Sequence, residues 1–261
     1  PVRRIRVLPE RPVVVGFGPA GMFAALTLLE HGLKPIVLER GRPIAERDGD
    51  LRRLYQERIL DPESNIQFGE GGAGAYSDGK LYTRIKADGE VASVLEAFIR
   101  FGAPAEIAFV AKPHLGTDVI REIVRRFRNH LLERGAEIQF RAKMTDLLLD
   151  DGRVRGVVVN GEREVRTSQV FLGIGHSARD TLAMLARRGV GLEPKPTAVG
   201  VRIEHPAAVI NRWRHGDKYQ NYPGINPASY ALTCTPREAG RGVYSFCMCP
   251  GGEVLNAASE P

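Results

Sequence analysis

The stretch VVVGFGPAG, residues 13–21, is the most informative part of this sequence, because it joins an apolar run to a Gly-x-Gly-x-x-Gly spacing. The apolar residues before Gly16 predict a short buried strand, and Phe17–Gly32 predicts a helix. Gly16 lets the chain turn sharply out of the strand, and Gly18 lets the backbone approach a phosphate. Gly21 lets the helix pack closely on the sheet. The pattern predicts a turn that holds the pyrophosphate of a dinucleotide at a helix N-terminus.

An acidic residue follows at the distance that a dinucleotide requires. Lys34–Glu39 predicts a second buried strand, and Glu39 lies 18 residues after Gly21. A carboxylate there accepts hydrogen bonds from the adenosine ribose, each contributing about 1.5–3 kcal/mol. If this strand end faces solvent, replacing Glu39 should weaken nucleotide binding and hardly affect folding. A tight turn without a ligand is the alternative, but strand, helix and carboxylate together favour the dinucleotide.

The next part of the chain predicts helices and one glycine-rich loop. Arg42–Leu60 is charged and expected to be partly helical. Gly69–Gly79 holds five glycines in eleven positions, which is too dense for a regular element. Val91–Phe101 and Thr117–Arg134 predict helices, the second with Thr117 or Asp118 as its N-cap.

Strands follow these helices. Ala136–Phe140 and Val170–Ile174 are apolar and predict strands of a parallel sheet. Between them, Asp151-Gly152 and Asn160-Gly161 are strong hairpin signals. They separate three short predicted strands, Asp146–Asp150, Val154–Val159 and Glu164–Arg166.

The composition changes after Leu192, where Pro, Gly and Tyr become frequent and helical periodicity fades. We therefore expect an α/β, Rossmann-like cofactor-binding domain over residues 1–191, with a parallel sheet and a β-meander. Residues 192–261 are expected to begin a second, smaller and mostly antiparallel domain of the substrate-binding type. We expect this second domain to be truncated.

Composition and charge exclude several classes of protein. The chain is 43% hydrophobic and 26% charged, and no apolar run approaches the roughly 20 residues that span a bilayer. Three cysteines are too few for a disulfide scaffold, so a cytoplasmic protein without a membrane partner is expected. The net charge of +6 includes a cluster of arginines in Thr117–Arg134. Their spacing predicts the wet face of an amphipathic helix rather than a nucleic-acid surface. No metal site is expected, because no second Cys/His pair at ligand spacing appears.

The turn that contains Pro19 resembles the glutathione-reductase-like superfamily of NAD(P)/FAD-dependent flavoproteins. In that superfamily a hairpin meander and a strand ending in Ala-Thr-Gly follow, and Asp146–Arg166 and Phe171–His176 stand in those places here. Three further stretches are similar to a narrower family, the uncharacterised bacterial FAD-dependent dehydrogenases: Gly69–Lys80, Pro113–Asp118 and Tyr244–Gly252. The resemblance covers nearly the whole chain and implies FAD as the cofactor. Members of that family are longer than this chain at both ends.

The resemblance also implies which residues contact FAD. They lie at strand ends or in glycine turns: Gly16, Gly18, Pro19, Ala20, Gly21, Glu39, Arg40, Gly71, Gly72, Ala73, Gly74, Met144, Gly173 and Gly175. Met144 would hold adenine through backbone atoms, and Gly173 and Gly175 would lie near the middle of the cofactor. Gly71–Gly74 would approach the pyrophosphate or the ring system, and the alternative for this loop is a flexible surface turn.

Few side chains are expected to carry chemistry, because the flavin ring itself performs it. His176 is a candidate acid or base, and the alternative is a histidine held by a backbone hydrogen bond. His114 and Lys80 are weaker candidates. Cys247 and Cys249 are expected to be small buried residues rather than a redox pair.

The sequence therefore predicts an FAD-dependent, dehydrogenase-like oxidoreductase. It would pass hydride or electrons between the flavin and an unidentified small-molecule substrate or electron partner. A flavin-dependent tRNA-modifying enzyme, suggested by the basic charge, is one alternative, and a non-catalytic flavin-binding module is another. The oligomeric state is not indicated.

Overall fold

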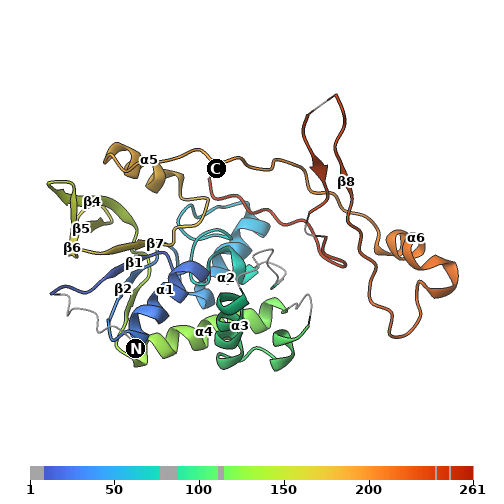
Figure 1. Cartoon of the computed structure of the whole chain (residues 1–261), viewed down its shortest axis with the longest axis horizontal. Coiled ribbons are helices and arrows are strands. Elements are labelled where there is room, and N and C mark those ends of the chain that lie inside the picture. The colour runs from blue at the N-terminus through green and yellow to red at the C-terminus, as the bar shows by residue number, and fades with distance from the viewer. Residues whose placement is uncertain are drawn as a thin grey trace. The chain divides into compact units, whose positions relative to one another are not determined.

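The computed structural model describes residues 9–76, 81, 88–110, 115–238, 240–246 and 248–260 (Figure 1). The chain divides into two compact units. Unit 1 comprises Pro1–Pro194 with Ala257–Pro261, and unit 2 comprises Lys195–Asn256. The assignment of a cofactor domain to residues 1–191 and of a substrate-type domain to 192–261 stays a prediction.

A parallel sheet of four strands forms the centre of unit 1, in the order β3-β2-β1-β7. The strands are β1 (Val13–Val15), β2 (Ile36–Leu38), β3 (Glu137–Gln139) and β7 (Val170–Leu172). In β1 and β2, Val13, Val14 and Val37 are fully buried, which explains why these runs carry no polar alternation. The parallel sheet that the sequence predicts is confirmed.

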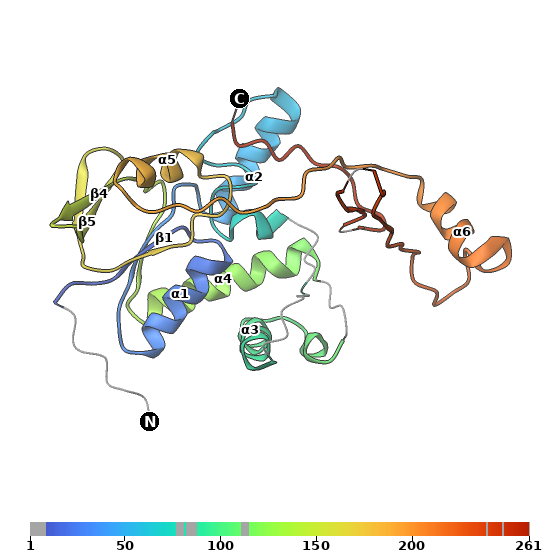
Figure 2. The ribbon, with the colours of Figure 1, turned by 45° about the horizontal axis from the view of Figure 1, so that its top comes forward.

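The two faces of the sheet pack against different layers (Figure 2). Val14 and Val37 join the apolar cluster of the helices α1 (Pro19–Glu30), α3 (Asp88–Arg100) and α4 (Thr117–Glu133). Successive residues of a strand point to opposite faces. Val13, Val15 and Leu38 therefore pack on the other side, against the antiparallel sheet and α5 (Arg179–Arg187).

The antiparallel sheet is the predicted β-meander. Its strands are β4 (Met144–Asp150), β5 (Arg153–Val159) and β6 (Arg163–Arg166), in that order. Asp151 and Gly152 have φ of 47° and 69°, and Asn160 and Gly161 have φ of 55° and 81°. Positive φ at both central positions is the backbone of the tight hairpin turn that these dipeptides favour. Both hairpin predictions are confirmed.

The remaining helices of unit 1 lie on the connections of the sheet. The predicted helical character of Arg42–Leu60 is confirmed by α2 (Ile44–Arg52), which continues into a π-helical turn, η1 (Arg53–Glu57). Two short 3₁₀ helices follow, η2 (Gly72–Tyr76) and η3 (Ala105–Ala108). No helix in the described ranges has both the length and the apolar character needed to cross a membrane.

Two expectations about helices are wrong. The N-cap of α4 is Gly116, and no side chain caps this end. Thr117 and Asp118 already lie in the first turn, where the Asp118 carboxylate faces the positive end of the helix dipole. The glycine-rich segment also contains regular structure. Gly71 and Gly72 supply the positive φ of the turn, and η2 winds onward from Gly72.

Unit 2 contains a helix that periodicity does not predict. This helix, α6 (Ala207–Tyr219), is interrupted at Gly216, and a short antiparallel pair, β8 (Thr233–Cys234) with β9 (Val243–Tyr244), follows. Among the described apolar side chains of unit 2, Ile210 and Ala228 are the buried ones. With one buried residue, α6 has no apolar stripe that sequence analysis could detect.

We predict that Gly21→Ala weakens the fold itself. A Cβ on Gly21 would lie 1.9 Å from the Gly16 carbonyl oxygen, so α1 would have to move away from β1. The free energy of unfolding should fall by about 1–3 kcal/mol or more, measured by urea denaturation without added nucleotide. Gly49→Ala in α2 is the control. Nothing lies within 4 Å of its Cβ position, and it should stabilise by about 0.5–1 kcal/mol. An unchanged Gly21→Ala protein would contradict this packing.

Candidate functional site

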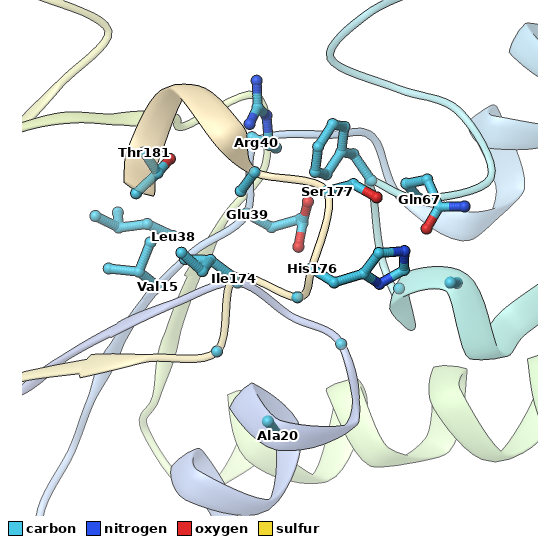
Figure 3. A pocket seen from close by; sticks show the side chains of 18 of the residues that line it. Val15, Ala20, Leu38, Glu39, Arg40, Gln67, Ile174, His176, Ser177 and Thr181 are labelled. Carbon is cyan, nitrogen blue, oxygen red and sulfur yellow. The ribbon is translucent and has the colours of Figure 1, made fainter. Parts of the chain in front are cut away.

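A cavity of about 230 Å³ opens at the carboxyl ends of β1, β2 and β7 (Figure 3). β1 and β2 end in residues of its wall, Val15 and Leu38, and a third wall residue, Gly173, directly follows β7. Ligands of open α/β sheets bind at this edge, because the helices that follow the strands start there. The cavity is therefore the candidate site.

The glycine turn after β1 forms one wall of the cavity. Gly16 has a φ of 94°, and a Cβ there would lie 2.4 Å from the Gly173 carbonyl oxygen. Gly18 is the N-cap of α1, Pro19 is its first residue, and no side chain caps this end. The first N–H groups of α1 therefore meet the cavity as backbone donors, which favours an anionic group such as a phosphate.

The glycine-rich segment before Tyr76 forms the facing wall. Gly71 donates its backbone N–H to the Phe17 carbonyl oxygen at 2.8 Å, which ties this segment to the first turn. A Cβ on Gly18 would lie 3.6 Å from the Cα of Gly72. The two backbones thus approach without side chains between them, which is the cradle that a pyrophosphate needs.

The Glu39 carboxylate joins three segments of the site. It is 4% exposed. Its Oε2 accepts the N–H of Phe17 at 2.7 Å, and its Oε1 accepts the N–H groups of Gly41 and Gly69 at 2.9 Å each. The condition under which replacing Glu39 would hardly affect folding, a solvent-facing strand end, is therefore not met, because the carboxylate holds together the first turn, the end of its own strand and the glycine-rich segment. Two of these donors lie 22 and 30 residues away in the sequence, where no local pattern reveals them.

A buried arginine forms hydrogen bonds to the backbone of the glycine-rich segment and of the residues before it. Arg47 is fully buried and donates to the carbonyl oxygens of Asn65 at 2.7 Å and of Ile66 and Gly72 at 3.1 Å each. Burial lowers its pKa below the ordinary value for arginine. Because its partners are backbone carbonyls, Arg47 fixes the path of the segment that carries Gly72. Sequence analysis missed this residue, since one arginine in a charged stretch gives no signal.

Glu70 is a second buried charge beside this segment. Its carboxylate accepts the Ile44 N–H at 2.8 Å and a hydrogen bond from Arg128 Nη1 at 2.9 Å. Burial raises the pKa of Glu70 despite these partners. The ion pair links the segment to α4, so the wall of the cavity is fastened to the helical layer.

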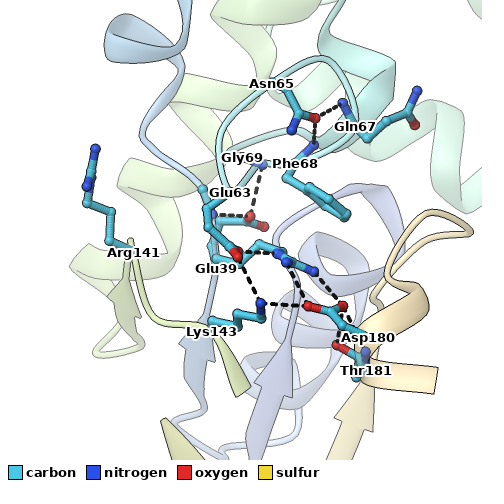
Figure 4. Close-up of polar contacts among 12 residues, drawn as sticks. Glu39, Glu63, Asn65, Gln67, Phe68, Gly69, Arg141, Lys143, Asp180 and Thr181 are labelled. Carbon is cyan, nitrogen blue, oxygen red and sulfur yellow. Dashed lines mark hydrogen bonds and ion pairs between the residues drawn. The ribbon is translucent and has the colours of Figure 1, made fainter. Parts of the chain in front are cut away.

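An ion cluster of Arg40, Glu63, Lys143 and Asp180 lies beside Glu39, and two of its members, Arg40 and Lys143, line the cavity (Figure 4). Arg40 donates to Glu63 at 2.7 Å and to both oxygens of Asp180 at 3.0 Å, and its guanidinium stacks on the ring of Phe68 at 4.0 Å. Lys143 pairs with Glu63 at 2.8 Å and with Asp180 at 2.6 Å. Burial would raise the pKa of Asp180, but hydrogen bonds from Arg40 and Lys143 outweigh it and hold that pKa well below its ordinary value.

Nearly all predicted site residues line this one cavity. They are Gly16, Gly18, Pro19, Ala20, Glu39, Arg40, Gly72, Ala73, Gly74, Met144, Gly173, Gly175 and His176. Gly21 and Gly71 lie just outside the wall. Gly21 packs α1 against Gly16, and a Cβ on Gly71 would face Ala75 and Val124.

The cavity has further lining residues that sequence analysis did not find. They come from loops and from the start of α5: Gln67, Phe68, Ala142, Lys143, Ile174, Ser177, Ala178 and Thr181. These residue types are common in loops and helices. Only the tertiary structure brings them to the site.

His176 lies on the connection between β7 and α5 and is exposed at the cavity wall (Figure 3). Within the described part of the chain it has no hydrogen bond, so the alternative of a backbone-held histidine is not what the structure shows. Its role as an acid or base stays a prediction. His114, Lys80 and Cys247 lie outside the described residues.

Comparison with known families gives two matches. Residues 73–205, just over half of the chain, match a family described as FAD binding domain. Residues 196–261 match a family described as FAD-dependent protein, C-terminal domain-like. Both matches begin after the glycine turn of residues 16–21, so they are independent of that motif.

Two curated proteins are similar to this chain over different lengths. An uncharacterized protein of Clostridium beijerinckii is 49% identical over 253 residues, which are 97% of this chain and 47% of that protein. A dual trans-enoyl reductase/FAD-dependent monooxygenase of Aspergillus terreus is 33% identical over 81 residues, 25% of this chain and 12% of that protein. This chain spans less than half the length of either relative.

Solved structures are similar in fold at low identity. THI4 of Thermovibrio ammonificans has a TM-score of 0.45 at 16% identity, over 70% of this chain and 64% of that chain. OTEMO in complex with FAD and NADP has a TM-score of 0.40 at 16% identity, over 64% and 26%.

We predict that Glu39→Gln destabilises the protein even without a nucleotide. The amide NH₂ would replace one acceptor and meet a backbone N–H, leaving a buried donor without a partner. The free energy of unfolding should fall by about 1–3 kcal/mol in urea denaturation. Glu137→Gln is the control, because Glu137 forms an exposed ion pair with Arg11 and should change stability by less than about 1 kcal/mol. Equal stability of the Glu39→Gln and wild-type proteins would show that the three hydrogen bonds do not hold the site together.

Proposed function

Because this chain belongs to the FAD-binding domain family, whose cofactor is FAD, we propose that it forms the flavin-holding part of a flavin-dependent oxidoreductase. For the whole protein we propose a dehydrogenase-like transfer of hydride or electrons between FAD and a small-molecule substrate or electron partner. We also propose that it belongs with the uncharacterised bacterial FAD-dependent dehydrogenases of the glutathione-reductase-like superfamily. A cytoplasmic location is part of the same proposal.

The observation that carries this proposal is that three glycine-containing segments line one cavity at the carboxyl ends of the parallel strands. The backbone at Gly16–Gly18, at Gly72–Gly74 and at Gly173–Gly175 lines the same cavity, beside the N-terminus of α1. Such walls leave room for the backbone to surround a pyrophosphate, and the helix end favours its charge. The residues present therefore fit the middle of FAD.

Glu39 would orient the adenosine half. A carboxylate has about four lone-pair sites, and the backbone N–H groups of Phe17, Gly41 and Gly69 occupy three of them. One site on Oε2 is left to accept a hydroxyl of the ribose. Because the three backbone bonds fix the carboxylate before binding, little side-chain entropy would be lost when the ribose binds.

The cofactor supplies hydride and electron transfer at its isoalloxazine ring. The chain's own residues bind the dinucleotide, orient it and exclude water from it. His176 on the wall of the cavity is our candidate to donate or accept a proton. The substrate and the oligomeric state stay unassigned.

The arginines of α4 do not favour the alternative of a tRNA-modifying enzyme. Four of them are held in ion pairs within the chain: Arg121 with Asp48, Arg125 and Arg126 with Glu122, and Arg128 with Glu70. Binding RNA through these arginines would require such pairs to open. We therefore propose no nucleic-acid partner, and we propose no membrane partner either.

We predict that the purified full-length protein contains non-covalent FAD. Denaturation should release FAD, identified by chromatography, and anaerobic titration with a panel of hydride and electron donors should reduce the bound flavin. Release of NAD alone, or no binding after reconstitution with FAD, would contradict the cofactor. Binding of a flavin that no donor reduces would leave the non-catalytic flavin-binding module as the function.

We predict that Gly72→Val reduces FAD affinity by at least about tenfold. The added side chain would displace the phosphate from the backbone, and the loss of one hydrogen bond to a charged group reduces affinity by about that factor or more. A Cβ on Gly72 would lie 3.1 Å from the Gly18 Cα and 3.6 Å from the Pro19 Cδ, between the two walls. The measurement is the FAD dissociation constant of the apoprotein, with its thermal unfolding measured in parallel.

The control is Gly32→Val. Gly32 has a φ of 81°, comparable with the 59° of Gly72, and nothing lies within 4 Å of its Cβ position. It should share the backbone strain and keep wild-type FAD affinity. A folded Gly72→Val protein with wild-type affinity would remove this segment from the binding site.

A further inference from the structure

Two cationic side chains lie at the same end of the cavity as Glu39. Arg40 directly follows Glu39, Lys143 directly precedes Met144, and all four residues line the cavity. In dinucleotide sites a carboxylate at the end of the second strand selects an unmodified ribose, whereas a nearby arginine accommodates a 2′-phosphate. The neighbours Glu39 and Arg40 thus give opposite signals about the adenosine that this site accepts.

The structure resolves this conflict through two further carboxylates. The Nε and both Nη atoms of Arg40 each donate to Glu63 or Asp180, so three of its five N–H groups are engaged. The same two carboxylates hold Lys143 Nζ at 2.8 and 2.6 Å. The four side chains of this cluster sum to zero charge, and Glu39, on the cavity wall beside Arg40, adds one negative charge.

We propose that Glu63 and Asp180 determine nucleotide specificity by occupying Arg40 and Lys143, so that the site rejects an adenosine carrying a 2′-phosphate. Such a phosphate would meet the Glu39 carboxylate, and the two cations on the cavity wall, Arg40 and Lys143, are already paired with Glu63 and Asp180. To gain a cation it would have to open an ion pair of Arg40, whose side chain is only 13% exposed. An unmodified ribose needs neither cation and uses the remaining acceptor of Glu39.

This inference rests on the proposed function, because it assigns the adenosine half of the dinucleotide to this end of the cavity. A purely structural role of the cluster makes a different prediction. The cluster joins the strand end at Arg40 and the start of β4 to the loop of Glu63 and the start of α5. If the cluster is only structural, its loss would weaken the binding of all nucleotides alike. If it determines specificity, its loss changes the ratio of the affinities for two ligands that differ only at the 2′ position.

The experiment measures binding of ADP-ribose and of 2′-phospho-ADP-ribose to the full chain freed of its flavin. Glu63→Gln and Asp180→Asn each remove one negative charge and keep the size of the side chain. Asp146→Asn is the matched control. Asp146 lies on β4 and pairs with Arg188 at the end of α5, so it also joins β4 to α5, but its ion pair involves neither Arg40 nor Lys143.

The wild-type protein should bind ADP-ribose at least about tenfold more tightly than 2′-phospho-ADP-ribose. Each variant should reduce this ratio of dissociation constants by at least about tenfold, which corresponds to the free energy of one charge-assisted hydrogen bond. The Asp146→Asn control should keep the wild-type ratio. Thermal unfolding identifies a variant that fails to fold, and the other variant then decides the outcome.

Three results would overturn the proposal. An unchanged ratio in a folded variant would show that Arg40 and Lys143 are not restrained for this purpose. Equal weakening of both ligands would make the cluster structural. Failure of the wild-type chain to bind either ligand or FAD would refute the proposed function as well, whereas binding of FAD and ADP-ribose with an unchanged ratio refutes this inference alone.

Discussion

The fold of the cofactor site depends on one buried carboxylate that accepts three backbone N–H groups. Glu39 takes one donor from the turn after β1, one from Gly41 shortly after β2 and one from the glycine-rich segment. Each of these donors would otherwise lie buried without a partner, which costs about 1–3 kcal/mol per group. The same carboxylate that is proposed to read the ribose therefore also builds the pocket in which the ribose would lie. For this reason binding and folding cannot be assigned to separate residues here.

A buried cation complements this anion on the other side of the glycine-rich segment. Arg47 holds carbonyl oxygens of the segment, including that of Gly72, while Glu39 holds the N–H of Gly69. Arg47 thus binds carbonyl oxygens of the segment, and Glu39 binds one of its N–H groups. Glycine at position 69 leaves space for the Arg47 side chain, since a Cβ there would lie 2.3 Å from it. Glycine-rich loops are often mobile, but here their backbone polar groups are bound, which presents a fixed surface to a phosphate.

Sequence reasoning succeeded where the signal is local. The Gly-x-Gly-x-x-Gly turn, the buried strands and both hairpins depend on residues a few positions apart, and they lie where the sequence predicts them. It failed where the partner is distant. Asp180 lies 140 residues from Arg40, and α6 buries too little apolar surface to show a periodicity. The burial of Glu39 gave no sequence signal for the same reason, because two of the donors around it come from other loops.

Arg40 shows why a motif read from adjacent residues can mislead about specificity. A free arginine beside the ribose carboxylate would attract a second phosphate, and the sequence alone presents it as free. In the fold its guanidinium stacks on Phe68 and is shared between two carboxylates, so its charge is already balanced before any ligand arrives. The ligand that a dinucleotide site binds then depends on which charged side chains remain without an ion-pair partner in the fold. The charged residue types in the sequence do not decide it alone. At this end of the cavity the unpaired charge is that of Glu39, and it favours a ligand that donates hydrogen bonds over one that brings a negative charge.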